Sequence, residues 1–239
     1  MCEGRLRRRH VDLDKRRNLL GHHLPYPRRD LLNGGRFLTQ AVFEATRSCV
    51  HDCEFCVAPS AWGRRQLQHP VSWVIEDIRR MGDRRILFLD LNLISEVDYA
   101  KELFRALIPL RVRWGGLATT MIAWDDELLD LAAESGCAGL LLGFESLSDG
   151  ALAESRKQFS SRMEYQTVIE KLHARKIAIQ GCFVFGFDDD DTSVFERTAQ
   201  FAIDHHIDLP RYAIMTPVPG TPLHQRLASE GRLLTTDWR

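Results

Sequence analysis

Three cysteines stand close together in the first quarter of the chain, at Cys49, Cys53 and Cys56, in the spacing C-x3-C-x2-C. An aromatic residue, Phe55, directly precedes the last of them. Thiolates so close in sequence can converge on one centre, and the run is typical of an iron–sulfur site. Because there are three thiols rather than four, one iron of a four-iron, four-sulfur cluster would stay open to another ligand.

A structural zinc ion is the chief alternative, because zinc also binds closely spaced cysteines. It needs a fourth ligand, and His51 and His69 are the candidates near the loop. Neither histidine has the paired spacing of a zinc-finger half-site. Under this alternative the chain is a structural zinc-binding or interaction module. A disulfide scaffold is disfavoured, because six cysteines in 239 residues are few and irregularly spaced.

Composition indicates one sizeable soluble domain, with 44% hydrophobic and 27% charged residues in a chain of 239. The 32 basic and 33 acidic side chains nearly cancel, so no overall field favours nucleic acid or an anionic membrane. No apolar run approaches the ~20 residues that span a bilayer, so no transmembrane segment is expected. Together with a thiol trio that needs reducing conditions, these features predict a cytoplasmic protein.

The framework that must position the cysteines is an alternation of strands and helices that begins after residue 36. Apolar, β-rich segments are expected at 38–45, 86–91, 112–117, 138–144, 177–185 and 212–215. Amphipathic helices are expected at 71–81, 96–108, 125–135, 162–175, 192–205 and 222–230. Near-continuous apolar runs such as 86–89 predict strands buried on both faces of a parallel sheet. Ligands bind at the carboxyl ends of such strands, where the cysteine loop falls.

Three regions divide the chain. Residues 1–36 lack periodicity and carry an excess of basic side chains, which predicts a basic linker or extended N-terminal segment. Residues 37–230 contain the six strand–helix units and form the predicted core. Residues 231–239 are expected to be a C-terminal tail.

The cysteine spacing, taken with the six units, resembles the radical S-adenosylmethionine (SAM) superfamily. The stretch from Pro27 to Trp238 is similar to the catalytic half of its cobalamin-domain-associated members, which include methyltransferases and cyclases of hopanoid and bacteriochlorophyll biosynthesis. The resemblance implies an α/β fold, a partial (βα)6 TIM-like barrel of parallel strands with outer helices. It also implies an enzyme. Its 4Fe-4S cluster, held by the three cysteines, would reductively cleave SAM to a 5'-deoxyadenosyl radical, for methyl transfer or C–H functionalisation of a small-molecule or lipid-like substrate.

Two segments resemble the parts of this superfamily that contact SAM. Residues 143–146 match a G-x-E-S segment, so Glu145 and Ser146 are expected at the cofactor. Residues 181–188 resemble a G-x-I-x-G-type strand that borders adenine, which implicates Gly181, Phe183 and Gly186. Helix capping by Glu145 or Ser146, and a plain central strand with a glycine turn, are the alternatives.

Further candidates stand at the end of the second strand and after the fourth. Asp90 and Asn92 occupy a place where relatives often show Asp-Asp-Asn, with Leu91 replacing one acid, and they could bind the methionine amino group or polar substrate atoms. Lys157 lies where relatives place a cation for the methionine carboxylate, although it could be surface charge. Phe55, inside the cysteine run, is also expected at the cofactor. No catalytic side chain is assigned.

The resemblance also bears on cobalamin and on partners. Here no Asp-x-His-x-x-Gly signature could supply a lower axial ligand, so cobalamin is a doubtful cofactor for this chain. A second alternative is a catalytically incomplete fragment that needs a separate cobalamin-binding (corrinoid) domain. The other expected partners are a small-molecule substrate and an electron donor such as flavodoxin or ferredoxin, with no nucleic acid.

Overall fold

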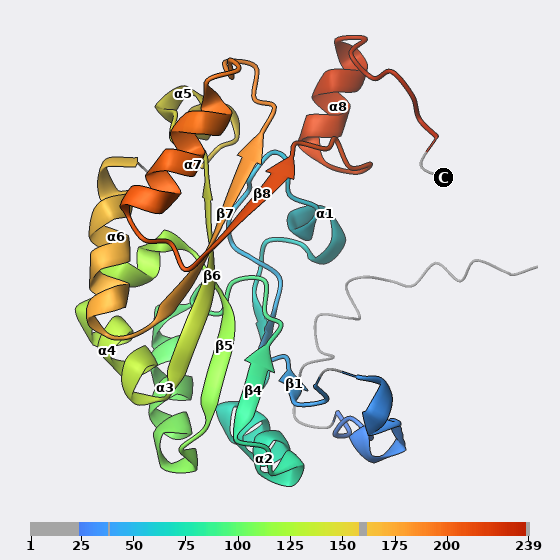
Figure 1. The fold of residues 1–239 in the computed structure, drawn as a ribbon. Coiled ribbons are helices and arrows are strands. Elements are labelled where there is room, and N and C mark those ends of the chain that lie inside the picture. The colour runs from blue at the N-terminus through green and yellow to red at the C-terminus, as the bar shows by residue number, and fades with distance from the viewer. Residues whose placement is uncertain (1–23, 38, 158–161, 238–239) are drawn as a thin grey trace, which may run out of the picture.

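The computed structural model describes residues 24–37, 39–157 and 162–237, and its main feature is a parallel sheet of six strands (Figure 1). The strand order is β1–β4–β5–β6–β7–β8, and every neighbouring pair runs parallel. The strands are β1 (Val42–Phe43), β4 (Arg85–Phe88), β5 (Arg113–Ala118), β6 (Cys137–Glu145), β7 (Ala178–Phe185) and β8 (Leu209–Ile214). A separate antiparallel pair joins β2 (Thr46–Arg47) to β3 (Leu67–Gln68).

Helices follow the strands as the periodicity predicts, and they lie mainly along one side of the sheet (Figure 1). The predicted helices are α2 (Val71–Met81), α3 (Val97–Leu107), α4 (Asp126–Glu134), α6 (Arg162–Ala174), α7 (Val194–Asp204) and α8 (Pro222–Ser229). Two short helices were not expected, α1 (Ala58–Trp62) and α5 (Asp149–Glu154). Short 3-10 turns complete the described elements: η2 (Arg29–Leu31), η3 (Gly34–Arg36), η4 (Ile108–Leu110) and η5 (Thr120–Trp124).

This strand order confirms the predicted partial (βα)6 barrel. Parallel crossovers are right-handed, so successive units place their helices on the same face of the sheet. Within the described residues, β1 and β8 are the edge strands and do not pair with each other, which leaves the barrel open. None of the described helices is long and apolar enough to cross a membrane.

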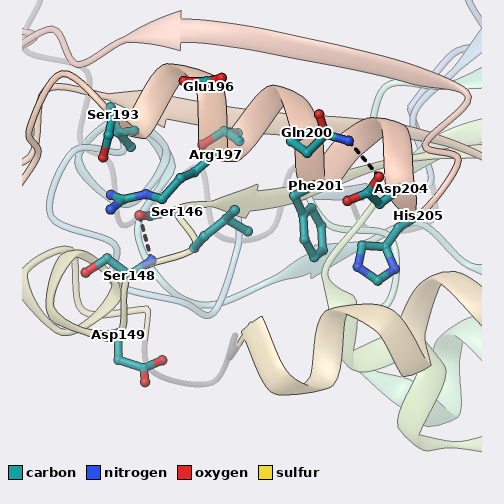
Figure 2. A pocket seen from close by; sticks show the side chains of 13 residues that line it. Ser146, Ser148, Asp149, Ser193, Glu196, Arg197, Gln200, Phe201, Asp204 and His205 are labelled. Carbon is teal, nitrogen blue, oxygen red and sulfur yellow. Dashed lines mark hydrogen bonds between the residues drawn. The ribbon is translucent and has the colours of Figure 1, made fainter.

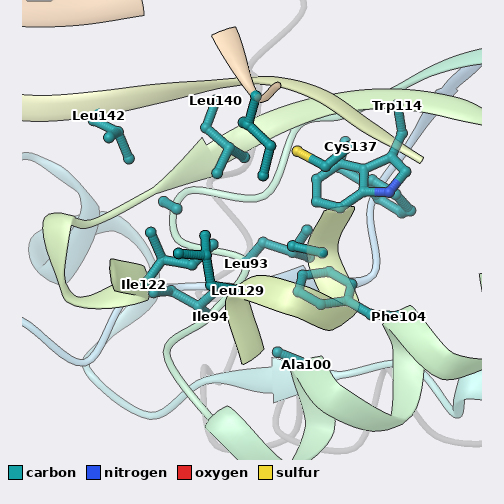
Figure 3. Packing of buried hydrophobic residues seen from close by; sticks show 14 of the residues in the cluster. Leu93, Ile94, Ala100, Phe104, Trp114, Ile122, Leu129, Cys137, Leu140 and Leu142 are labelled. Carbon is teal, nitrogen blue, oxygen red and sulfur yellow. The ribbon is translucent and has the colours of Figure 1, made fainter. Parts of the chain in front are cut away.

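The hydrophobic core lies between the sheet and the outer helices (Figure 3). Trp114 of β5 is fully packed, with its ring stacked on Phe104 of α3 at 5.1 Å between centroids. Its indole nitrogen donates to Ser135 Oγ at 3.0 Å, so the buried polar atom is satisfied. Further along the sheet, Phe144 stacks on Phe183 at 5.5 Å. These contacts hold β5, β6 and β7 in place against the helices.

The expectation that the strands are buried on both faces is wrong for the inner face of the sheet. In and just after β4, Ile86 and Phe88 are 2% and 1% exposed, whereas Leu87 and Leu89 are 43% and 60% exposed. Successive side chains of a strand point to opposite faces, so only the face under the helices is packed here. The open barrel leaves the inner face uncovered by the described residues.

The described part of the predicted linker packs against α2. Arg29 donates to Asp77 at 2.8 Å and to the carbonyl of Val42 at 2.7 Å, and the ion pair is largely buried. Tyr26 stacks on Trp73, whose indole donates to the carbonyl of Leu24 at 3.2 Å. Residues 24–29 therefore make specific contacts with the core, whereas residues 30–33 and 35–37 are exposed. Residues 1–23 lie outside the described part.

Candidate functional site

The cysteine run lies in the loop between β2 and β3, at the carboxyl end of β1. The turn is closed by a hydrogen bond from Cys56 N to the carbonyl of Cys53 at 3.1 Å. The amide of Ala58, at the start of α1, donates to Cys56 Sγ at 3.4 Å. All three thiols are free and half-buried. The predicted trio is therefore presented from one short loop, together with half-buried Phe55.

Burial governs the acidity of these thiols. It raises the pKa of Cys53 to about 11, and the nearby ammonium of Lys157 partly opposes that rise. Burial likewise raises the pKa of Cys56, while the amide of Ala58 lowers it. Both thiols are thus protonated at neutral pH, and a metal centre that binds thiolates would displace their protons.

A cluster and a single ion place different demands on the donor set. In the described part of the chain, no three His, Cys, Asp or Glu side chains gather closely enough to hold one metal ion. Zinc requires its sulfur ligands within about 2.3 Å of a single point. Three free thiols on one loop, with a neighbouring cation to offset their negative charge, fit an iron–sulfur cluster held at several corners.

Glu145 stands at the end of β6 in an unusual backbone conformation. Its φ is 64°, and the register with β7 shifts between Gly143 and Glu145. A positive φ at a residue with a side chain is uncommon, and such bulges often re-aim side chains beside active sites. The distortion turns the Glu145 carboxylate toward Lys157, whose Nζ donates to Glu145 Oε1 at 2.5 Å.

Gly143 makes room for this ion pair. Lys157 Nζ also donates to the carbonyl of Gly143 at 2.8 Å, so the ammonium rests directly above the glycine. A Cβ added at Gly143 would lie 2.1 Å from Glu145 Oε1 and 2.6 Å from Lys157 Nζ. The glycine and the carboxylate of the G-x-E-S segment are thus parts of one buried arrangement, and its side chains are only 7% and 11% exposed.

The ion pair lies within electrostatic reach of the cysteine loop. Lys157 lowers and Glu145 raises the pKa of both Cys53 and Cys56, although burial is the larger effect on each thiol. Glu145 also contributes to the raised pKa of Cys182 on β7, which burial dominates. The charges of Glu145 and Lys157 therefore act on two of the three cysteines, Cys53 and Cys56.

Asp90 and Asn92 are buried just after β4, and Asp90 binds the backbone that leads into the cysteine loop. Asp90 accepts from Ala45 N at 3.1 Å, from Thr46 Oγ1 at 2.7 Å and from the amide of Thr46. Asn92 is 2% exposed, and its side-chain oxygen has no hydrogen-bond partner among the described residues. Asp90 thus fixes the backbone three residues before the first cysteine, while contacts of either residue with SAM stay a prediction.

The β7 candidates divide between two places. Phe183 is fully buried on the helix side, and a Cβ at Gly181 would meet the ring of Phe144 at 3.1 Å. Gly186, with φ 107°, reaches the strand-end edge, where its amide and that of Phe187 donate to Asp190. Gly186 thus lies just after the carboxyl end of β7, and the adenine contact of this strand stays a prediction.

Ser146 lines a cavity of about 860 Å³ between the start of α5 and α7 (Figure 2). Its hydroxyl accepts from Ser148 N at 3.0 Å. Arg197 and Phe201 of α7 line the opposite wall together with His205, which directly follows the helix, and no cysteine of the loop is among the lining residues. The structure thus directs Ser146 to a turn on the helix side, and its predicted cofactor contact is not tested.

Two charged residues of the site were not predicted, Glu54 and Arg226. Glu54 lies between Cys53 and Cys56 and is 7% exposed, and Arg226 of α8 donates to it at 2.9 Å. The only sequence signal is a carboxylate placed among the cysteines. Because its partner lies 172 positions away, no local pattern joins the two.

Comparison with known proteins gives relatives of one kind. No family model matches the chain. It is 33% identical to bacteriochlorophyllide d C-12(1)-methyltransferase of Chlorobaculum tepidum, over 81% of this chain and 43% of the relative. It is 27% identical to hopanoid C-2 methylase of Rhodopseudomonas palustris, over 90% of this chain and 42% of that protein. The chain thus spans less than half the length of these relatives.

Among solved structures, the radical SAM methyltransferase TsrM of Kitasatospora setae has a similar fold. The TM-score is 0.73 at 17% sequence identity, over 82% of this chain and 41% of TsrM. That structure holds cobalamin and a [4Fe-4S] cluster. Because the sequence relatives and the fold agree with the cysteine loop at the barrel edge, the chain belongs to the radical SAM superfamily.

Proposed function

We propose that this chain is the radical SAM core of an enzyme that binds a 4Fe-4S cluster through Cys49, Cys53 and Cys56 and cleaves SAM reductively. The observation that carries the proposal is a loop with three free thiols, two of which are under the electrostatic influence of the buried Lys157–Glu145 pair. When bound and reduced, the cluster would supply one electron to SAM, whose carbon–sulfur bond would break to give methionine and a 5'-deoxyadenosyl radical.

The chain's own residues would hold the cluster and balance its charge. The thiols of Cys53 and Cys56 lose their protons on binding, because only thiolates ligate iron. Lys157 offsets part of the negative charge of the thiolates, and the Ala58 amide stabilises that of Cys56. Thiolate ligation of this kind needs a reducing compartment, and we propose a cytoplasmic location on that ground.

The Lys157–Glu145 pair suits the amino-acid end of SAM. That end carries an ammonium and a carboxylate, and the pair offers one carboxylate and one ammonium within 2.5 Å of each other. An incoming zwitterion can exchange partners with the pair and leave no buried charge uncompensated. We assign Lys157 to the SAM carboxylate and Glu145 to its ammonium.

Methyl transfer is the favoured outcome, because both sequence relatives described above carry methyltransferase or methylase names. A small-molecule or lipid-like substrate and an electron donor such as flavodoxin or ferredoxin would be needed as partners. The exposed inner face of the sheet, with Leu87 and Leu89, supports an apolar substrate.

Anaerobic reconstitution of the full chain with iron and sulfide tests the proposal. After reduction with dithionite in the presence of SAM, 5'-deoxyadenosine and methionine are measured in wild type, Cys53→Ala and Cys137→Ala. Cys137 is a buried core cysteine, so its variant controls for loss of any thiol. Product in wild type and Cys137→Ala but not in Cys53→Ala supports the proposal. A colourless wild-type protein without product contradicts it.

A further inference from the structure

A backbone hydrogen bond joins helix α8 to the cysteine loop. The amide of Leu223 donates to the carbonyl of Glu54 at 3.1 Å. Ser60 Oγ, at α1, donates to the carbonyl of Gly220 at 2.6 Å. On the other side, the amide of Glu54 donates to the carbonyl of Ser155, at the end of α5. Glu54 is therefore the point where the loop meets two other elements.

Arg226 of α8 holds the Glu54 side chain at this point. Its guanidinium donates to both Glu54 oxygens, at 2.9 and 3.3 Å, and to Glu154 of α5 at 2.7 Å. A third carboxylate, that of Asp188, accepts from it at 3.2 Å. The arginine pKa is raised, and the hydrogen bond to Glu54 is the largest cause. A planar guanidinium can serve several carboxylates at once, which an ammonium matches poorly.

We infer that Arg226 is a positioning residue for the cluster: by binding Glu54 it fixes the segment between Cys53 and Cys56 and neutralises a carboxylate beside the bound cluster. The inference rests on the proposed function. Glu54 is nearly buried and lies one residue from Cys53 and two from Cys56. Without the arginine, its negative charge would stand unbalanced next to a centre that must accept an electron.

Two variants and a matched control separate positioning from simple stability. Arg226→Gln removes the cation, Glu54→Gln removes the carboxylate charge, and Arg232→Gln is the control. Arg232 binds Asp188 and Glu230 in the same charged network, with no contact to Glu54 in the described structure. The full chain is used throughout, and unfolding midpoints are recorded for every variant.

The first measurement uses protein without cluster. Cys53 and Cys56 are alkylated with iodoacetamide under anaerobic conditions, and the rate at each thiol is read by mass spectrometry. In Arg226→Gln we expect alkylation about tenfold faster than in wild type, the factor that corresponds to one lost charge-assisted hydrogen bond. Arg232→Gln should match wild type. Equal rates in Arg226→Gln and Arg232→Gln would overturn the inference.

The second measurement is the reduction potential of the reconstituted cluster, followed by electron paramagnetic resonance. Arg226→Gln should lower the potential, because an unbalanced Glu54 carboxylate opposes reduction, whereas Glu54→Gln should raise it. A merely structural loosening would move both variants in the same direction, and that result would contradict the inference. If wild type binds no cluster, the proposed function fails, and the alkylation rates still decide the role of Arg226.

Discussion

Two buried ion pairs, at different places in the molecule, differ in the backbone that carries them. Arg29–Asp77 joins the segment before β1 to α2, and its side chains are 13% and 4% exposed. Lys157–Glu145 is equally buried at 7% and 11%. The first pair rests on ordinary backbone, and its arginine also packs over the Phe43 ring. The second requires a positive φ at Glu145 and a glycine beneath it.

The two pairs differ in backbone strain, which is present only at Lys157–Glu145. A pair that only joins elements can form without backbone distortion, as Arg29–Asp77 does. A distorted pair whose charges act on Cys53 and Cys56 indicates that position, rather than stability, has set the geometry. The comparison therefore predicts that both pairs support folding and that only one supports the site.

The largest expected effect comes from breaking each pair in turn. Lys157→Met and Arg29→Met should each lower the free energy of unfolding by about 3–5 kcal/mol, because each leaves a buried carboxylate without its cation. Only Lys157→Met should also abolish SAM binding by reconstituted protein. Urea unfolding and equilibrium dialysis with labelled SAM measure the two effects. Loss of SAM binding in folded Arg29→Met would break the comparison.

A second prediction concerns Asp90, a buried carboxylate that accepts hydrogen bonds from the neutral donors of Ala45 and Thr46. Burial raises its pKa to about 6, above an ordinary value of 3.8. The folded state thus binds the Asp90 proton more tightly than the unfolded state does. Protonated Asp90 therefore contributes fully to the free energy of unfolding below pH 3.8, and this contribution is lost as the pH rises to about 6. The loss should reach at most about 3 kcal/mol.

Urea unfolding of wild type and Asp90→Asn across this pH range measures the contribution. The stability of wild type relative to the variant should fall as pH rises through the window. A relative stability that increases instead would mean that the hydrogen bonds from Ala45 and Thr46 outweigh burial and lower the Asp90 pKa.

The smallest expected effect comes from one added methyl group. Gly143→Ala should push the Lys157–Glu145 pair apart and weaken SAM binding about tenfold, since a charge-assisted hydrogen bond is lost. Gly116→Ala is the matched control, because its nearest contact would be an ordinary 3.5 Å. Dialysis with SAM compares the two. Similar affinities in both variants would show that the space at Gly143 does not set the site.

Local signals explain why much of the fold could be predicted from sequence. Helix 71–81 is confirmed to the residue because Pro70 precedes it and Gly82, with φ 74°, ends it. β8 begins three residues earlier than expected, at Leu209, although a proline follows. Pro210 is tolerated because β8 is an edge strand, where one side of the backbone needs no partner.

The candidate site was only partly predictable. The cysteine loop can be recognised in the sequence by its spacing. The left-handed backbone of Glu145 and the space at Gly143 depend on tertiary contacts. Glu54 and Arg226 are joined only by the fold, since neither belongs to a repeating pattern. For residues 86–89 the prediction of burial on both faces was wrong, because an apolar run does not reveal that an open barrel leaves one face uncovered.

The contact between Glu54 and Arg226 also has a consequence for the order of events during synthesis. The two residues are 172 positions apart, so a ribosome needs about 10–30 s to make the arginine after the cysteines. During that interval the nascent loop lacks its contact with α8. We therefore expect the loop to mature only after α8 has been synthesised and has docked against it.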